Sequence, residues 1–446
     1  MKKFFLKPLS LLLALVMVGS LTACSSGNNE NAQSATGSPK SVKTYTLLMY
    51  TDWYKSGWKA LEEYINNHTD ETGFKLNIQK IAGGSQGDQV IETKFASGDL
   101  PDMIETYGPQ WVDANANGLS KLVPLDDISS KEQYDSASLD SYYKYNGKLY
   151  GMPIDSVVLS GVFYNKKVFS KLNLSIPKNW DELLAACTKI KAAGITPVYY
   201  SAKDEWTASG IDLVGFTEDV VNSGKSFTDY MNELNSNKRH FADSPAFLDL
   251  LQKGKDLITK GFVNSTYLSD TYDNAQQALV NGKAAMYPLG TWVIDEIRQK
   301  YPDQLDDIGA FPLPTPSGKG YVQMFDPFTI SVTTSSSDVE GAKKALDFIE
   351  SSKAQQIYAT AQPGIYLNKN VSVSNLPQAD QDLKKVMDAG KAMTDWESVL
   401  KYSVGNGSGY ILSFYTGQLK TPADVGKTMD AEMKKNAQSK NDPNWK

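Results

Sequence analysis

Segments with strand-like and helix-like patterns of apolar residues alternate along this chain, and this alternation limits its possible folds more than any other feature. In chain order, two segments with helical spacing separate three strand-like segments: 44–50, 57–67, 74–81, 88–97 and 102–107. Strands that alternate with helices pack as sheets with helices on both faces. The first part of the chain is therefore predicted to form an α/β unit with a parallel-type sheet.

A second alternating series follows. Its first helix is predicted over 179–193, where Asn179 can cap the N-terminus and Glu182 can complete a capping box. Cys187 falls on the apolar face of this helix and is predicted to be a buried thiol. The later segments are predicted as strands at 197–201, 283–288 and 327–333, as helices at 245–260, 273–281, 291–300, 338–359 and 421–435, and as a proline-rich loop or crossing at 308–317.

The length of the chain favours two lobes, because single cores stop growing beyond about 250–300 residues and this chain has 446. Its formal net charge of −6 argues against a nucleic-acid partner, since phosphate binding needs a basic face. The two Cys and two His match no zinc spacing, which disfavours metal-dependent or nucleophilic chemistry but leaves carboxylate chemistry open. Aromatic residues make up 11% of the chain, and such rings are good walls for small polar ligands.

Residues 1–23 have the pattern of a secretory signal peptide, with three lysines before an apolar run at 9–18. Leu21-Thr22-Ala23-Cys24 resembles the bacterial lipoprotein signal. That resemblance implies cleavage before Cys24 and a diacylglyceryl group on its sulfur; the alternative is an accidental Cys in an ordinary signal peptide. Residues 24–41 are predicted to be a flexible tether. Acyl chains would then hold the body at the outer face of the bacterial cytoplasmic membrane.

Several short phrases resemble one protein family, and their order and spacing extend over about 42–440. The phrases are FASGDLPD at 95–102, GKLYGMP at 147–153, FYNK at 163–166, WDEL at 180–183, NGKAAM at 281–286, GTW at 290–292 and GAFPLP at 309–314. They resemble segments of the family 1 extracellular solute-binding proteins of sugar importers, the group that contains maltose-binding protein. The resemblance implies an α/β, two-lobed fold of the type II periplasmic-binding-protein kind, with a ligand cleft between lobes joined by hinge crossings.

The same resemblance implies a function, partners and lobe boundaries. It implies a binding protein rather than an enzyme, one that captures a carbohydrate without a cofactor or metal. The ligand would be delivered to two ABC permease subunits in the membrane, which act with a cytoplasmic ATPase, and the binding protein would be a monomer. By analogy, the N-terminal lobe comprises 42–157 plus 327–370, and the C-terminal lobe comprises 158–326 plus 371–446.

The predicted ligand site follows from the chemistry of a sugar, which offers apolar C–H faces and a rim of hydroxyl groups. Aromatic rings can stack on the faces and carboxylates can pair with the hydroxyls, because a buried unpaired polar group costs about 1–3 kcal/mol. Open α/β sheets bind such ligands at the carboxyl ends of their strands. Residues predicted at these ends and at the crossings, several of them matching ligand contacts of the family, form the predicted ligand-binding set: Asp52, Trp53, Tyr107, Asp155, Glu205, Trp206, Trp292, Asp326 and Gly364.

Some of these residues have a second interpretation. Asp155 and Asp326 fall at predicted crossings, where each carboxylate could bind ligand or form a hinge hydrogen bond. Gly364 could offer its backbone to the ligand or simply permit a turn. Trp292 is favoured most, because its Gly290 turn follows a predicted strand and the resemblance there is closest.

Other functions stay open as alternatives. Gly83-Gly84-Ser85-Gln86-Gly87 fits the G-x-S-x-G pattern of a hydrolase nucleophile elbow, and His240 could act as the base of a secreted serine esterase. The elbow would lie on the second strand without an HGGG-like oxyanion loop, so a polar loop is the simpler interpretation. A glycosidase would need two positioned carboxylates, and no pair stands out in the sequence. A substrate-sensing lipoprotein, or a binder of a non-sugar solute, would share the same fold.

Overall fold

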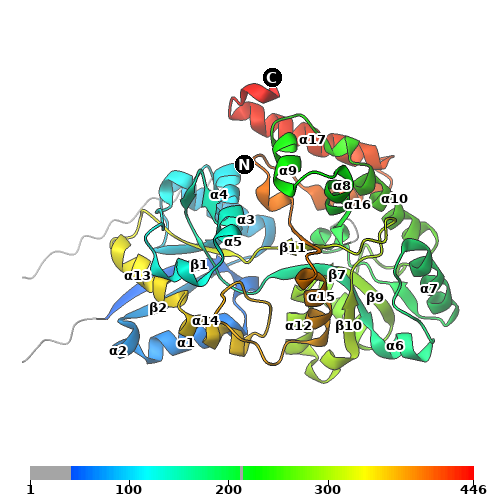
Figure 1. The fold of residues 1–446 in the computed structure, drawn as a ribbon, viewed down its shortest axis with the longest axis horizontal. Coiled ribbons are helices and arrows are strands. Elements are labelled where there is room, and N and C mark those ends of the chain that lie inside the picture. Colours follow the sequence, from blue (N-terminus) through cyan, green and yellow to red (C-terminus); the bar gives the residue numbers. More distant parts are fainter. Residues whose placement is uncertain (1–41, 211–213) are drawn as a thin grey trace, which may run out of the picture. The chain divides into compact units, whose positions relative to one another are not determined.

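A five-stranded sheet forms the first lobe, with strand order β2-β1-β3-β12-β6 (Figure 1). The computed structural model describes residues 42–210 and 214–446, and residues 42–446 form one compact unit. The predicted signal peptide, Cys24 and the tether therefore lie outside the described residues. The strands of this sheet are β1 (Lys43–Tyr50), β2 (Phe74–Ile81), β3 (Met103–Thr106), β6 (Met152–Pro153) and β12 (Thr329–Val332).

The first sheet is parallel over β2, β1 and β3, as predicted, and antiparallel over β12 and β6. β1 pairs in parallel with β2 and β3, whereas β12 pairs antiparallel with β3 and β6. Side chains of β1 are buried on both faces, with Leu47 and Met49 in one core and Leu48 and Tyr50 in the other. Burial on both faces explains why this strand has a nearly continuous apolar sequence.

Helices cover both faces of the first sheet. They are α1 (Ser56–Asn67), α2 (Thr69–Thr72), α3 (Gly84–Ser97), α4 (Pro109–Ala116), α5 (Ser136–Tyr142), α13 (Val339–Ile349) and α14 (Ser352–Ala361). Trp58 of α1, Leu346 of α13 and Tyr358 of α14 enter the core on one face, and Phe95 of α3 and Val112 of α4 enter the core on the other. The helical spacing of apolar residues in each segment accounts for this burial.

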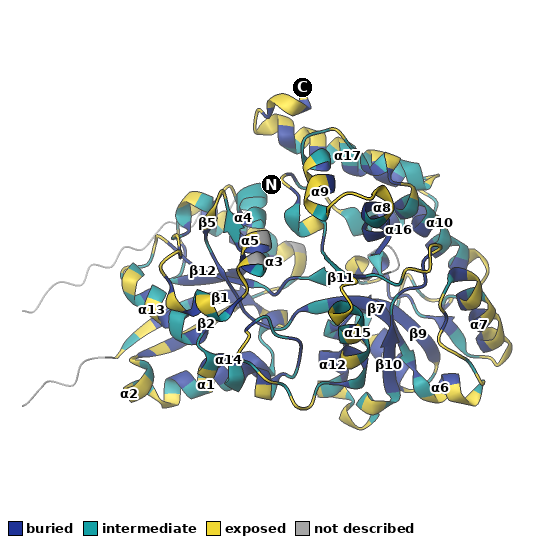
Figure 2. Cartoon of the chain, viewed as in Figure 1, coloured by how far each residue is buried: buried dark blue, intermediate teal, exposed yellow. Residues whose placement is uncertain are grey.

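A second sheet, with strand order β13-β11-β7-β9-β8 and β10 also paired with β7, forms the second lobe. Its strands are β7 (Val158–Asn165), β8 (Thr196–Val198), β9 (Ala284–Gly290), β10 (Ile308–Phe311), β11 (Val322–Phe325) and β13 (Ala392–Thr394). Figure 2 shows β7, β9 and β10 as buried strands. β7 pairs antiparallel with β9, β10 and β11, whereas β8 with β9 and β11 with β13 are parallel pairs, so the second sheet is mixed and not of the parallel type that alternating strands and helices suggest. Apolar periodicity shows that a strand is buried but carries no information about the direction of its neighbours.

The helices of the second lobe follow the predicted pattern closely. They are α6 (Lys166–Lys171), α7 (Trp180–Ala192), α8 (Gly215–Ser223), α9 (Phe227–Asn235), α10 (Pro245–Thr259), α11 (Tyr272–Val280), α12 (Trp292–Lys300), α15 (Gln378–Asp388), α16 (Gly407–Tyr415) and α17 (Pro422–Ser439). Asn179 caps α7, because its Oδ1 accepts a hydrogen bond from the Glu182 backbone N–H at 2.9 Å. Cys187 is fully buried as predicted, and burial raises the pKa of its thiol to about 12.

Three local predictions are wrong. The stretch 308–317 contains strand β10, which pairs with β7 before the prolines begin. The segment 338–359 is two helices, because the Ser351 hydroxyl caps α14 and Glu350 is buried, where it accepts a hydrogen bond from Tyr134 at 2.6 Å. The strand predicted at 197–201 ends at Val198. The Tyr199 backbone N–H still donates to the Met286 carbonyl of β9, but the Tyr200 backbone N–H donates to the Asn264 side chain instead of to a strand.

The chain passes between the two sheets at three crossings. The first joins β6 to β7, the second joins β11 to β12 through Asp326, and the third joins α14 to α15. The first and third crossings lie side by side, because Val157 and Ile365 form an isolated antiparallel bridge. The exact lobe boundaries stay a prediction.

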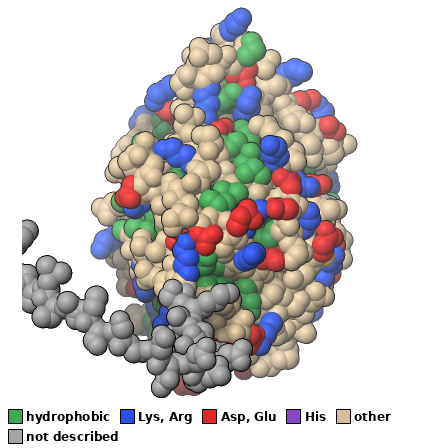
Figure 3. All heavy atoms as spheres, turned by 90° about the vertical axis from the view of Figure 1, so that its left-hand side faces the viewer, with side chains coloured by type: hydrophobic (Ala, Val, Ile, Leu, Met, Phe, Trp, Pro, Cys, Tyr) green, Lys and Arg blue, Asp and Glu red, His purple; other side chains and the backbone are tan. Residues whose placement is uncertain are grey.

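The surface at the first-lobe end mixes acidic and basic side chains, as Figure 3 shows. This face is unlike the continuous basic surface that phosphate binding needs. Within the described ranges, no helix combines the length and the apolar composition that a membrane crossing requires.

Candidate functional site

One aromatic group lies at the carboxyl ends of β1 and β3 in the first lobe. Trp53, in the short helix Thr51–Trp53, stacks on Phe328 with ring centroids 3.6 Å apart and planes 13° apart. Tyr107 follows β3 and meets Trp53 edge to face at 5.0 Å. Parallel strands end at the same edge of a sheet, which is why two residues far apart in sequence come together here. We call Trp53, Tyr107 and Phe328 the first wall.

The structure thus brings together Trp53 and Tyr107 from the predicted set and adds Phe328, which sequence reasoning missed. Asp52 precedes the first wall and is exposed, with its carboxylate directed at Gly83. Trp53 is only 8% exposed, so most of its surface is already packed against protein. The half-buried Tyr107 and Phe328 offer the accessible part of this wall.

A second aromatic group lies in the second lobe. Trp292, the first residue of α12, has its ring centroid 6.0 Å from that of Trp206 and 5.4 Å from that of Phe325. Trp206 also meets Tyr272 at 5.1 Å and is 46% exposed, which is unusual for so large an apolar side chain. We call Trp206, Tyr272, Trp292 and Phe325 the second wall.

Gly290 explains the position of the Trp292 ring. A Cβ atom at residue 290 would come within 2.4 to 2.7 Å of three ring atoms, so the indole lies directly over this glycine. The indole Nε1 of Trp292 and the hydroxyl of Tyr272 are both buried and have no hydrogen-bond partner among the described residues. Each is therefore a buried donor whose hydrogen bond is not made by the described residues.

The two walls meet at the second crossing. Phe325 ends β11 and belongs to the second wall, and Phe328 lies three residues later and belongs to the first wall. Asp326 lies between them and is 8% exposed. Its Oδ2 has no hydrogen-bond partner among the described residues. Burial, with the repulsion of Asp395 as a second cause, raises the pKa of Asp326 to about 7.

Two further acids, which sequence reasoning missed, approach the same crossing. Asp395 follows β13, which pairs in parallel with β11, and its carboxylate accepts hydrogen bonds from the Ser398 backbone at 2.9 Å and from the Gln323 side chain. Burial raises the pKa of Asp395 to about 6. Glu397 keeps contact with solvent, but the protein around it and the nearby Asp395 charge raise its pKa as well. Glu397 begins a short helix, Glu397–Val399, that packs against α4 and α5 of the first lobe.

Asp326→Asn is expected to raise the free energy of unfolding near pH 8 and to leave it almost unchanged near pH 4. The folded pKa of about 7 lies above the ordinary value of 3.8, so between these values the folded protein keeps a proton that the unfolded chain releases. The stability that protonated Asp326 contributes is fully present below the unfolded pKa. It is lost as the pH rises through the folded pKa, and the unmodified protein stays less stable above that pH. This pKa difference corresponds to at most about 4 kcal/mol.

Urea unfolding at the two pH values measures this effect, with Asp303→Asn on the exposed surface as the control. An equal gain at both pH values, or the same gain in the control, would contradict the prediction.

A buried network of ion pairs and hydrogen bonds connects residues near the first and third crossings. Lys55 Nζ lies 3.6 Å from Asp295 Oδ2, and these side chains are 14% and 11% exposed. Arg298 binds the other oxygen of Asp295 at 2.6 Å and donates to the Pro363 carbonyl at 3.1 Å. Because Lys55 belongs to the first lobe and Asp295 to the second, this network connects the two lobes directly.

Asp155 belongs to this network. Its Oδ1 accepts hydrogen bonds from the Gln362 side chain at 2.7 Å and from the Ser156 backbone at 2.6 Å. Its φ of 80° is strained for a residue other than glycine. Burial raises the pKa of Asp155 to about 6, against the opposing effect of Lys55. The hinge hydrogen bond is thus present, while the ligand-binding interpretation of Asp155 stays a prediction.

Gly364 lies where the first and third crossings touch. A Cβ atom at this position would come within 2.5 Å of the Ser156 Cβ, so only glycine permits this close approach. Glu205 is exposed and accepts a hydrogen bond from Asn406, the residue that caps α16. Glu205 is therefore held on the second lobe beside Trp206, and a contact with ligand stays a prediction.

The esterase interpretation receives no support from the geometry of His240. Its ring lies 3.5 Å from Asp243 and 3.2 Å from Asn237 in the second lobe. The G-x-S-x-G segment begins α3, whose apolar side chains enter the first-lobe core, and the Ser85 side chain lies outside the described ones. Within the described ranges, no group of three or more Cys, His, Asp or Glu residues is arranged to hold a metal ion.

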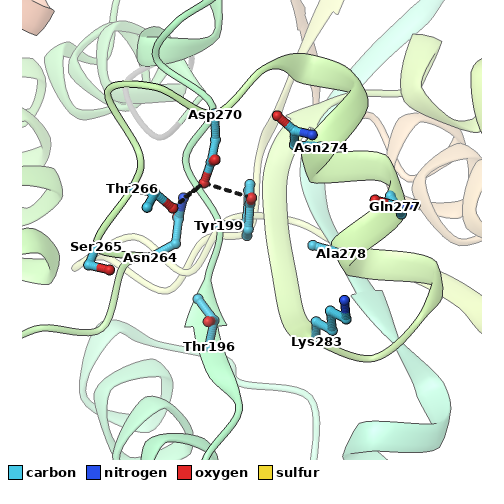
Figure 4. Close-up of a pocket in the computed structure, with 10 residues that line it drawn as sticks. All are labelled: Thr196, Tyr199, Asn264, Ser265, Thr266, Asp270, Asn274, Gln277, Ala278 and Lys283. Carbon is cyan, nitrogen blue, oxygen red and sulfur yellow. Dashed lines mark hydrogen bonds between the residues drawn. The ribbon is translucent and has the colours of Figure 1, made fainter.

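A cavity of about 350 Å³ lies elsewhere, on the second lobe beside β8 and α11 (Figure 4). One of its lining residues, Asp270, accepts hydrogen bonds from Tyr199 at 2.8 Å, Asn264 at 2.7 Å and Thr266 at 2.6 Å. None of the predicted ligand-binding residues lines this cavity. We therefore take the two walls, which contain four of those residues with Asp326 between them, as the candidate site.

Comparison with known proteins decides the family. The sequence profile of the bacterial extracellular solute-binding proteins matches residues 53–356, more than half of the chain. The chain belongs to this family. A multiple sugar-binding protein of Streptococcus mutans is 28% identical to this solute-binding protein over 295 residues, covering 64% of this chain and just under two thirds (66%) of that protein. An uncharacterized ABC transporter extracellular-binding protein of Pyrococcus horikoshii is 25% identical over 438 residues and 93% of each chain.

Solved structures with the same fold confirm the predicted two-lobed architecture. The solute-binding protein RafE in complex with raffinose has a TM-score of 0.72 at 19% identity, covering 88% of this chain and 99% of that chain. A structure from a study of xylan utilization by Caldanaerobius polysaccharolyticus has a TM-score of 0.73 at 22% identity, covering 87% and 100%. At these identities the likeness concerns the fold.

Proposed function

We propose that this solute-binding protein captures a carbohydrate, a mono- or oligosaccharide, and delivers it to an ABC-type import permease. The observation that carries the proposal is the meeting of two aromatic walls, one from each lobe, at a crossing where buried polar atoms lack partners. Ring faces suit the C–H faces of a sugar, and unpaired donors and acceptors suit its hydroxyls. The relatives named as sugar-binding proteins support the same substrate class.

The proposed contacts divide into two groups. Trp53, Tyr107, Trp206 and Trp292 would supply the stacking surfaces. Polar contacts would come from Asp52, Glu205 and Asp326 and from the backbone at Gly364, with Asp155 as a hinge residue that also faces the ligand.

Transport would follow from closure of the lobes, here 42–157 plus 327–370 and 158–326 plus 371–446. A ligand that touches both walls binds the closed state better than the open state, and only such a difference can drive closure. The closed monomer would then dock on two permease subunits served by a cytoplasmic ATPase. A lipid on Cys24 would keep the protein at the outer face of the membrane, and no chemical step on the ligand is required.

A thermal-shift screen of the purified protein against mono- and oligosaccharides, with amino acids as controls, tests this proposal. A ligand at 100 times its dissociation constant stabilises the folded state by about 2.7 kcal/mol. We expect a saturable shift with one class of saccharide and recovery of that saccharide unchanged. A shift with amino acids alone would overturn the substrate class, and conversion of the saccharide to a product would overturn the binding role.

A further inference from the structure

Buried acceptors outnumber buried donors at the end of β11. Gln323 is 1% exposed; its Nε2 donates to Asp395, which fixes the orientation of the amide, and its Oε1 has no hydrogen-bond partner among the described residues. Three residues later, Asp326 also has an unpartnered oxygen. A buried acceptor without a donor costs about 1–3 kcal/mol, so these two atoms call for a ligand that brings several donors.

The described residues supply no cation to the acids at this place, and burial therefore keeps the pKa of Asp326 at about 7, so that its carboxyl ionises fully only when a cation binds. Among the ion pairs of the described residues, none includes Asp326, Asp395 or Glu397, and the two cations of the hinge network, Lys55 and Arg298, are both paired with Asp295. A ligand hydroxyl would donate one hydrogen bond but offset no charge. An ammonium group donates three and carries the opposite charge, and hydrogen bonds between charged groups are about twice as strong as neutral ones.

The rings around these acids also suit a cation. Phe325 and Phe328 flank Asp326, and an ammonium within about 6 Å of a ring face is attracted to it. The other titratable groups near Asp326 are the phenols of Tyr142 and Tyr143, whose pKa values are raised by burial and which therefore stay neutral. Among the described residues, no Lys, Arg or His forms an ion pair with Asp326, Asp395 or Glu397, so no such cation would repel a cationic ligand there.

We propose that the preferred ligand carries a protonated amine, an amino sugar unit, which binds Asp326 and Glu397 at the end of β11 between the two walls. The proposal rests on the carbohydrate-binding function above and narrows its substrate class. The amine would donate to Asp326 Oδ2 and to Gln323 Oε1, and Glu397, which lies beside Asp395, would be its second carboxylate partner. The walls would stack on the sugar ring that carries the amine.

Isothermal titration calorimetry of the purified protein near pH 6.5 tests the proposal with four probes. They are a deacetylated chitosan oligosaccharide, its N-acetylated counterpart of the same length, a glucose oligosaccharide of the same length and an aliphatic diamine. Each is measured in two buffers of different ionisation enthalpy, which reports protons taken up or released. Asp326→Asn and Glu397→Gln remove the two proposed partners, and Asp303→Asn on the exposed surface is the matched control.

We expect the deacetylated oligosaccharide to bind at least about tenfold more tightly than the N-acetylated one, with release of the proton that Asp326 holds in the free protein. Asp326→Asn and Glu397→Gln should each remove most of this preference, and Asp303→Asn should keep it. Equal or tighter binding of the neutral oligosaccharides would overturn the amine proposal and leave carbohydrate binding in place. Binding of the diamine without any saccharide would support the amine site and overturn the carbohydrate function.

Discussion

Lys55→Met lowers the free energy of unfolding by about 3–5 kcal/mol near pH 8, because it leaves buried carboxylates without their cation. Burial alone would lower the pKa of Lys55. The nearby carboxylates of Asp295 and Asp155 have the larger combined effect, so the pKa is raised and the side chain stays charged. The side chains of Lys55 and Asp295 are 14% and 11% exposed, so solvent screens their attraction only weakly. Methionine keeps the volume of the side chain and removes only its charge.

The loss should be smaller near pH 5. Without Lys55, the folded pKa of Asp155 rises further above its present value of about 6, and a protonated Asp155 needs no cation. In the variant, the free energy of unfolding therefore continues to fall up to a higher pH than in the unmodified protein. The difference between the two free energies of unfolding grows toward pH 8. Denaturant unfolding followed by circular dichroism at both pH values measures the gap. Lys59→Met, on the exposed face of the same helix, should change stability by less than about 0.5 kcal/mol.

Prediction from the sequence succeeded for strands and helices whose formation depends on their own residues and not on distant contacts. The first sheet, α1 and the Asn179 cap follow from local periodicity and capping chemistry, and the structure confirms them. β10 was missed because Pro312 and Pro314 suggested a loop, although the four residues before them are all buried. The break between α13 and α14 depends on Glu350, which is buried against Tyr134, a residue distant in sequence.

In the candidate site, too, contacts between residues distant in sequence could not be predicted. Trp53, Tyr107, Trp206 and Trp292 follow strands, and the rule about strand ends together with the family resemblance selected them. Asp395 reaches Gln323 across 72 positions because β13 pairs with β11, and no local pattern reports this pairing. The segment Phe325-Asp326-Pro327-Phe328 did carry a usable signal, since an acid with an aromatic residue on each side at a crossing is suited to a site between two lobes.

Lys55 was missed for a different reason. A lysine before a helix is ordinarily solvated, and its role here exists only because Asp295 and Asp155 arrive from other parts of the chain. Charged networks of this kind are defined by tertiary contacts, and the sequence alone offers no means to choose their members.

Trp292→Ala is expected to weaken binding of the tightest saccharide by about 30-fold or more, since a central aromatic anchor in a binding site commonly contributes more than about 2 kcal/mol. The ring of Trp292 is the centre of the second wall, in contact with both Trp206 and Phe325, so its loss removes the stacking surface and the support of its neighbours. Quenching of intrinsic tryptophan fluorescence or calorimetry measures the dissociation constant. Circular dichroism establishes that the fold is kept.

Trp292→Phe separates the two contributions of this residue. Phenylalanine keeps a ring over Gly290 and removes the unpartnered Nε1 donor, so we expect a loss of about tenfold, the cost of one buried hydrogen bond. Leu268→Ala, at a side chain of the second lobe that is 50% exposed, controls for the loss of apolar surface outside the walls and should leave the affinity unchanged. If Trp292→Ala and Leu268→Ala bound the saccharide equally well, the second wall would not be the binding surface, and the cavity around Asp270 would become the alternative site.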